Sequence, residues 1–364
     1  MKSFVSRRTG ALCSTLAIAM FAAACSDSTG PGGTFDPEAT RQDVEAITSA
    51  IDADEILAGL GLIGNSLSGQ LGTPSIVAPG ADLLPTVDHL RTFALAGGGS
   101  AGPIFPSNLL GVTFVYDEMV GDYVPSALTG APANGVRFLY YAMNPVTEQP
   151  VLPLLELGYV DLIDESSPSS TRLQVFLVDT SGASPATLVD YFIDGSFTLN
   201  GTTLSVTLQA EGFISDGTDQ LDFVLSESGS FTEGASSFSV SAHHSLSVPS
   251  QGVSLNLTGT ATLPLDEGGA LAAAFAVAIT DGVNVAVLSL DLTDASVEGT
   301  ITYNGVVVIV ISGTEDSLTF ARPDGTELSA EEIEALQVIA DAADDMFEFA
   351  EHILEPMGGI FGTS

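Results

Sequence analysis

Residues 112–321 alternate between apolar and polar side chains with a period of two. The alternation is strict in Leu204–Leu208 and in Phe238–Ala242. Successive side chains of a strand point to opposite faces, so the pattern predicts antiparallel strands with one buried and one solvent-facing surface. Tight hairpin turns are expected at Asn200-Gly201, Asp281-Gly282 and Asn304-Gly305.

About ten or more strands joined in this way form a meander that is too wide to stay flat. The sequence therefore predicts a large curved antiparallel β-meander, half-barrel or barrel-like. Two runs lack the alternation, because Ala272–Ile279 and Val306–Ile311 are apolar at every position. Strands of this kind are expected to be buried on both faces.

A short glycine-containing sequence motif recurs along the predicted sheet. It has the form Gly-Ser/Thr-x-Thr and begins at Gly195, Gly229, Gly259 and Gly299. A glycine weakens a strand unless a bulge or bend requires it, so the repeat favours a sheet bent around something. Chance recurrence in a glycine-rich β protein is the alternative.

Helical spacing of apolar residues is found on both sides of this region. Asp36-Pro37 is typical of a helix start, and the pattern after it predicts one broken helix or a helical hairpin over residues 36–64. Ser329 and Glu332 form a capping box before an apolar stripe, which predicts a helix over 329–355 that ends at Pro356. Its other face is acidic, so we expect the stripe to pack inside or across the curved sheet.

The fold class is therefore mainly β, with α+β character at the margins, in a single globular domain over residues 36–364. Within it we expect a helical segment (36–64), an irregular segment (65–111), the antiparallel sheet (112–321) and the C-terminal helix (329–355).

The first 29 residues have the pattern of a targeting signal. Lys2, Arg7 and Arg8 form a basic region, a mostly apolar run follows, and small residues lead to Cys25. This resembles a bacterial lipoprotein signal, with Ala22 where that family usually has Leu. The resemblance implies that signal peptide 1–24 is removed, that Cys25 is lipidated and anchors the protein in the membrane, and that 25–35 form a flexible tether. An ordinary secretory signal cut near Ala24 is the alternative.

Removal of the signal leaves a strongly acidic chain with five Arg, no Lys and 46 acidic residues, a formal charge of 5 − 46 = −41. Nucleic acid is excluded as a partner, because binding it depends on clustered cations. The lack of lysine excludes Schiff-base chemistry. Cys13 leaves with the signal and Cys25 carries the lipid, so no thiol remains for a disulfide or a zinc site. We expect no cofactor.

The histidines do not form an obvious metal site. His243 and His244 are adjacent in an alternating strand, so they point to opposite faces and do not bind one metal together. Each is expected to be a satisfied or partly exposed strand histidine. His89 is isolated, and His352 follows Glu348 by four residues, the spacing of a surface pair on a helix.

Two further patterns carry weaker chemical signals. The run from Gly98 to Gly102 matches a nucleophile elbow around Ser100, but Pro103 follows where a helix must begin, which disfavours a serine hydrolase. Asp216, Asp219 and Asp222 are weak candidates for calcium ligands across a hairpin. Acidic clusters arise freely in this chain, so we predict no metal site. A pair of catalytic carboxylates from distant strands stays open.

These observations predict a non-enzymatic, lipid-anchored protein of the bacterial cell envelope, on the periplasmic side or the cell surface. The mean hydropathy is +0.37 despite the acidic residues, which favours an apolar small molecule or lipid held by the curved sheet. The outline is similar to that of periplasmic lipoprotein carriers, by analogy of architecture alone. The alternatives are a cation-dependent surface adhesin or structural module, and a hydrolase whose site residues meet only in the fold. The sequence identifies no protein partner.

Overall fold

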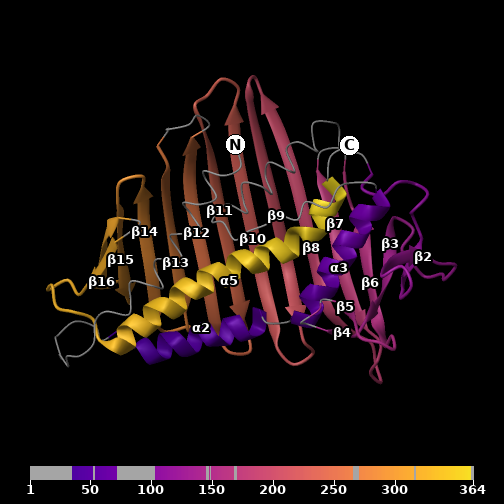
Figure 1. Cartoon of the computed structure of the whole chain (residues 1–364), viewed down its shortest axis with the longest axis horizontal. Coiled ribbons are helices and arrows are strands. Elements are labelled where there is room, and N and C mark those ends of the chain that lie inside the picture. The colour runs from indigo at the N-terminus through magenta and orange to yellow at the C-terminus, as the bar shows by residue number, and fades with distance from the viewer. Residues whose placement is uncertain are drawn as a thin grey trace.

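A computed structural model of the chain consists of one very large β-sheet and a layer of helices (Figure 1). The structure describes residues 35–51, 54–71, 103–144, 147, 149–167, 170–264, 270–314 and 317–361. The helices are α2 (Pro37–Ile51), α3 (Asp54–Leu71) and α5 (Ala330–Phe361). No helix in these ranges is long and apolar enough to cross a membrane.

The strands of the main sheet follow one another along the chain as expected from the alternating pattern. They are β1 (Thr113–Asp117), β2 (Asp122–Pro125), β3 (Gly135–Tyr141), β6 (Glu156–Asp164), β7 (Thr171–Asp179), β8 (Ala186–Asn200), β9 (Thr203–Ser215), β10 (Gln220–Thr232), β11 (Ser237–Val248), β12 (Val253–Pro264), β13 (Ala272–Thr280), β14 (Val285–Thr293), β15 (Val297–Tyr303), β16 (Val306–Thr314) and β17 (Ser317–Ala321). A separate small hairpin consists of β4 (Met143–Asn144) and β5 (Gln149–Pro150).

The main sheet contains 15 described strands and is open. From β17 back to β6 the strands are ordered as in the sequence, and the order then continues β3, β1, β2. Neighbours pair antiparallel except for β1 and β3, which pair in parallel through Thr113 and Phe114. The sheet is therefore mixed rather than wholly antiparallel. The predicted mainly β fold with a large curved meander is confirmed.

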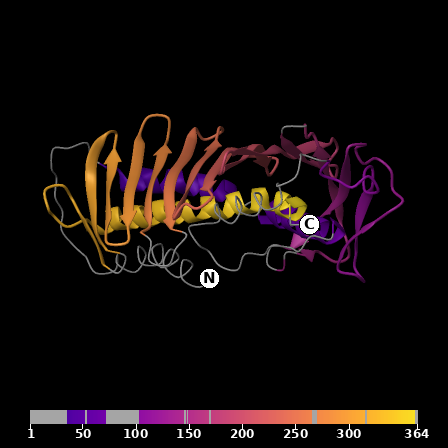
Figure 2. The same cartoon turned by 90° about the horizontal axis from the view of Figure 1, so that it is seen from above.

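All three helices lie on one face of the sheet, which curves around them (Figure 2). We call this the inner face and the opposite one the outer face. Helix α5 runs across the strands, with α2 and α3 beside it (Figure 1). The inner face and the helices share one continuous core of buried side chains. The stripe on the last helix thus packs across the curved sheet, as predicted.

The boundaries of the helices differ from the expected ones in two places. Helix α3 continues to Leu71, so residues 65–71 are helical rather than irregular. It passes through Gly59, where a Cβ atom would lie only 2.6 Å from Cε2 of Tyr140, so the glycine permits close packing of helix and strand. Helix α5 continues past Pro356 to Phe361, although an interior proline removes a backbone hydrogen bond and disfavours the helix.

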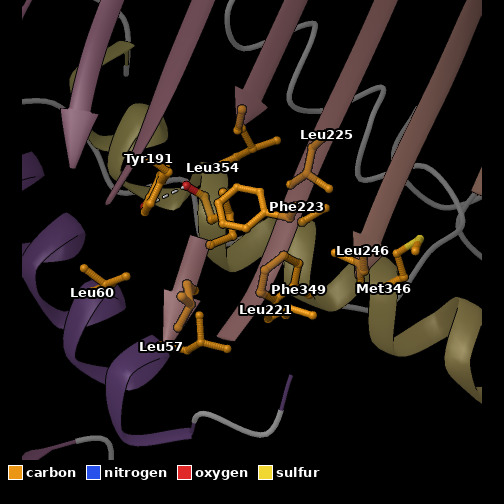
Figure 3. Close-up of a cluster of buried hydrophobic side chains, with 14 of the residues drawn as sticks. Leu57, Leu60, Tyr191, Leu221, Phe223, Leu225, Leu246, Met346, Phe349 and Leu354 are labelled. Carbon is orange, nitrogen blue, oxygen red and sulfur yellow. Dashed lines mark hydrogen bonds between the residues drawn. The ribbon is translucent and has the colours of Figure 1, made fainter. Parts of the chain in front are cut away.

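An aromatic cluster fixes the position of α5 on the sheet (Figure 3). The rings of Tyr191 on β8 and Phe223 on β10 pack edge to face at 5.5 Å, and Phe223 contacts Phe349 of α5 at 5.4 Å. The Tyr191 hydroxyl donates a hydrogen bond to the carbonyl of Ile353, 3.2 Å away. Together these contacts connect two strands to two successive turns of the helix.

The start of α5 is held by the predicted capping box. The Ser329 N–H donates to Glu332 Oε2 at 2.7 Å, and the Glu332 N–H donates to Ser329 Oγ at 3.2 Å. Arg322 adds an ion pair of 2.7 Å to the same carboxylate. These bonds satisfy backbone donors that a helix start leaves without intrahelical partners.

Two strands that were expected to be buried on both faces are covered on one face only. In β16, Ile309 and Ile311 are buried, whereas Val310 is 37% exposed, and in β13 Ala272 is exposed. The reason is that the described helices lie only on the inner face, so every strand keeps one face outside the core. An apolar run therefore gives the wrong prediction of burial here.

The structure explains the glycine repeat at some of its positions but not at all of them. Through successive strand pairs, Gly195, Gly259 and Gly299 fall in one transverse row of the inner face. A Cβ at Gly299 would lie 2.4 Å from the Ser289 carbonyl oxygen, so this position requires glycine. A Cβ at Gly259 would have no heavy atom closer than 3.7 Å, so the repeat is not required at every position.

Candidate binding surface on the outer sheet face

Two shallow, open hollows lie on the outer face of the described part of the chain. The first has a volume of about 430 Å³ and lies over β8–β11. The second has a volume of about 480 Å³ and lies over β10–β14. Because the inner face is covered by helices and packed side chains, the outer face is the accessible surface of the sheet.

The first hollow combines carboxylates with aromatic rings, and we call it the acid–aromatic hollow. Its defining side chains are Asp190, Phe192, Glu211, Phe213, Asp222 and Val224. The register places Phe213 directly between Asp190 and Asp222, and Phe192 directly opposite Glu211. Residues facing each other on neighbouring antiparallel strands have Cβ atoms about 5 Å apart. Each ring is therefore flanked by carboxylate at short range.

Glutamine amides hold the three carboxylates of this hollow. Asp190 Oδ1 accepts from Gln174 Nε2 at 2.8 Å, and Asp222 Oδ1 accepts from Gln220 Nε2 at 2.5 Å. Glu211 Oε2 accepts a longer bond of 3.5 Å from Gln209. An amide orients a carboxylate without neutralising it, so the hollow keeps its negative charge.

Two arginines of the outer face are already engaged, Arg172 beside the hollow and Arg137 on β3, three strands away from β8. The guanidinium of Arg172 lies 4.1 Å from the centre of the Phe192 ring and contacts Asp194 at 3.1 Å. The guanidinium of Arg137 lies 3.6 Å from the centre of the Tyr159 ring. It also donates two hydrogen bonds of 2.7 Å to Asp161, and this pairing raises the pKa of Arg137. Burial raises the pKa of Asp194, although Arg172 opposes this effect.

The second hollow is lined mainly by small and hydroxyl-bearing side chains. Ser226, His243, Thr258, Ala276 and Ser289 face one another in register across β10–β14. His243 is exposed on this surface. The hollow has little charge and no large side chain at its centre, so its chemistry is less specific than that of the first.

The adjacent His244 lies on the inner face, as the alternation predicted, but its environment was not foreseen. His244 and Glu227 are 0% and 2% exposed, with Nε2 and Oε1 3.4 Å apart. That distance suits an ion pair, but the geometry gives neither ring nitrogen of His244 a hydrogen bond within the described part of the chain. The ring also contacts Phe347 of α5 at 5.7 Å. His244 is therefore fully buried beside Glu227 rather than partly exposed.

The weak calcium candidates do not converge. Asp216 accepts the N–H groups of Thr218 and Asp219 in the turn, which lowers its pKa. Asp219 accepts a hydrogen bond from Ser250 at 2.9 Å, and Asp222 belongs to the acid–aromatic hollow. No group of three metal-ligating side chains is found among the residues that the structure describes.

Four other residues were singled out in the sequence: His352, Cys25, His89 and Ser100. His352 lies 3.9 Å from Glu348, which confirms the surface pair on the last helix. Cys25, His89 and Ser100 lie outside the described residues.

The acid–aromatic hollow was missed by sequence reasoning, although a signal for it exists. In β8 and β9 every second residue faces outward, and most of these outward-facing residues are polar. Phe192 and Phe213 occupy two such positions among acidic residues. Large rings at positions where a solvent-facing strand normally has small polar residues indicate a binding surface. The partner strand of each ring depends on register, which the alternation alone does not determine.

Comparison with protein-family models, with curated proteins and with solved structures gives no significant match. The function is therefore argued from the residues of this chain.

Proposed function

We propose that this protein is a lipid-anchored, non-enzymatic binding protein of the bacterial cell envelope, and that it binds through the outer face of its sheet. The lipid on Cys25 would hold the protein at the membrane, following the resemblance of its first residues to a lipoprotein signal. The globular domain would then present its sheet to other molecules of the envelope.

The observation that carries this proposal is the contrast between the two faces of the sheet. The inner face is filled by helices and by one continuous core. The outer face has the acid–aromatic hollow, where two half-buried phenylalanine rings lie among three carboxylates. A concave surface with apolar groups and a few placed polar groups is the usual form of a binding site.

Glu227 and His244 are both buried, so this pair offers no general acid or base to a substrate. It is the closest approach of a histidine and a carboxylate in the described part of the chain. General acid–base catalysis requires contact with the substrate, and neither side chain reaches the surface.

Hydroxyl-radical footprinting tests where the protein binds. The lipidated protein is oxidised in intact envelopes and, separately, after purification in detergent. We expect Phe192 and Phe213 to be protected in the envelopes. Met119, which is 97% exposed in the β1–β2 turn, is the internal control and should react equally in both samples. Equal oxidation of the two phenylalanines in both samples would reject the outer face as the binding surface.

A further inference from the structure

We propose that the acid–aromatic hollow binds arginine side chains from a basic segment of another protein. The inference rests on the proposed function, because it names the partner of that surface. The proposal rests on the position of Phe213 between Asp190 and Asp222 in register. In the described structure no guanidinium lies over the Phe213 ring.

The outer face already contains two arginines that each contact both an aromatic ring and a carboxylate. Arg137 lies over Tyr159 and forms a two-bond pair with Asp161. Arg172 lies over Phe192 and contacts Asp194. In both cases a planar guanidinium lies on an aromatic ring while a neighbouring carboxylate accepts its N–H groups, a combination that suits arginine better than lysine.

Phe213 has carboxylate neighbours but no arginine, and its two flanking carboxylates lie opposite the ring on the neighbouring strands rather than two residues later on its own strand. In the same transverse row of strands, Arg137 lies opposite Asp161, followed by Phe176, Asp190, Phe213 and Asp222. Two carboxylates flank the Phe213 ring, and a third, Glu211, precedes it on the same face of the hollow. The hydrogen bonds from Gln174 and Gln220 leave one oxygen of each flanking aspartate for a further donor.

The described part of this chain supplies no arginine for that place. Arg41 pairs with Glu38 and Glu45 on α2, and Arg322 pairs with Glu332 before α5. Arg137 and Arg172 are engaged as above, and the chain after residue 24 contains no lysine. Arg91 lies outside the described residues, so the four described arginines leave the negative charge of the hollow without a cation, and we take that cation to come from another molecule. The apolar surface of Val224, which is 38% exposed, fits the methylene stem of a long side chain better than a hydrated metal ion.

The test compares two peptides that differ only in charge. An eight-residue peptide of alternating Arg and Gly, capped at both ends, is titrated into the purified full-length protein by calorimetry. In the matched peptide each Arg is replaced by citrulline, which keeps the shape and loses the charge. We expect the arginine peptide to bind and the citrulline peptide to bind at least about tenfold more weakly, because both the ion pairs and the cation–π contacts are lost.

Matched variants locate the binding. Asp222→Asn and Phe213→Leu should each weaken the arginine peptide severalfold. Glu298→Gln is the control, because it removes one exposed charge from β15 on the same face outside the hollow, and it should bind the peptide like the wild type. Equal binding of both peptides, or equal losses in Asp222→Asn and Glu298→Gln, would overturn the proposal. Protection of Phe213 in envelopes together with that result would leave the outer face as a binding surface for a different ligand.

Discussion

Glu227 and His244 form a buried pair with Oε1 and Nε2 3.4 Å apart, on neighbouring strands beneath the helix layer. Their transverse rows on the inner face are mainly apolar or glycine, with Thr171 and Asp164 at the far ends on β7 and β6. His244, for example, lies between Leu225 and Leu257 in register. The helices cover this position with apolar side chains such as Phe347. A carboxyl group and an imidazole buried in such surroundings each have few other polar partners, so the removal of one affects the other.

The first prediction concerns removal of one partner of this pair. His244→Leu leaves a carboxylate in an apolar environment, so we expect it to lower the free energy of unfolding by about 3–5 kcal/mol. The double variant Glu227→Leu/His244→Leu replaces the pair by apolar side chains and should be about as stable as the wild type or more stable. Urea denaturation measures both. A double variant less stable than His244→Leu would contradict this account.

The second prediction concerns the strand between Tyr191 and Phe223. These two rings meet across β9 because Gly212 faces them without a side chain. A Cβ at Gly212 would lie 2.4 Å from the Tyr191 Cβ and 2.2 Å from the Asp190 carbonyl oxygen. We expect Gly212→Ala to lower the free energy of unfolding by more than about 2 kcal/mol, since neither neighbour can move freely.

Gly234→Ala is the control for this variant. Gly234 also has a positive φ, of +78°, but a Cβ added there would have no atom within 4 Å. It should therefore show only the local conformational cost of about 1–2 kcal/mol. The two variants are compared by urea denaturation, and equal losses would show that steric contact at Gly212 is unimportant.

The third prediction concerns the pH dependence of stability. Burial raises the pKa of Asp43 on α2 to about 6, and the nearby Asp281 and Asp36 add to the effect. The folded protein thus holds this proton more tightly than the unfolded chain, and stability falls as the pH rises from about 4 to 6. Asp43→Asn removes that loss, so it should raise the melting temperature at about pH 7.5 and have little effect near pH 3.5.

Glu298→Gln provides the comparison for Asp43→Asn, because it removes the same formal charge from an exposed strand position. Thermal melts over a pH series measure both. If the two substitutions raise the melting temperature equally at about pH 7.5, the effect is one of net charge and the burial of Asp43 has no special role.

The fourth prediction concerns the membrane anchor. Cys25→Ser removes the thiol that the lipoprotein-like signal would modify. We expect the variant to incorporate no palmitate analogue in metabolic labelling and to leave the membrane fraction. Retained label would reject lipidation at this residue. Loss of label without release would show that another contact holds the protein at the membrane.

Much of the fold was predictable from local patterns. The alternation of Leu204–Leu208 gives β9, and the capping box at Ser329 and Glu332 gives the start of α5. The parallel pairing of β1 with β3 was not predictable, because it depends on contacts between segments and not on periodicity. The exposure of Val310 was missed for a related reason, since an apolar run does not show whether a second layer covers it.

The candidate surface was predictable only in part. Phe213 is a large apolar residue at a position of β9 where the alternation predicts a polar one, and this exception can be seen in the sequence. Its position between Asp190 and Asp222 depends on the pairing of three strands. The sequence pattern of β10 and β11 likewise placed His244 on the inner face, but its pairing with Glu227 required the register as well.

The place of α5 in the chain order has a consequence for biosynthesis. This helix contacts α2 and α3, which precede all the strands, yet it follows the last strand of the main sheet. In a nascent chain the part of the inner face that α5 covers therefore stays exposed until residues 330–361 have been made. Partly made sheets of this kind are prone to aggregate. Export in an unfolded state, followed by folding of the complete chain, would avoid that exposure.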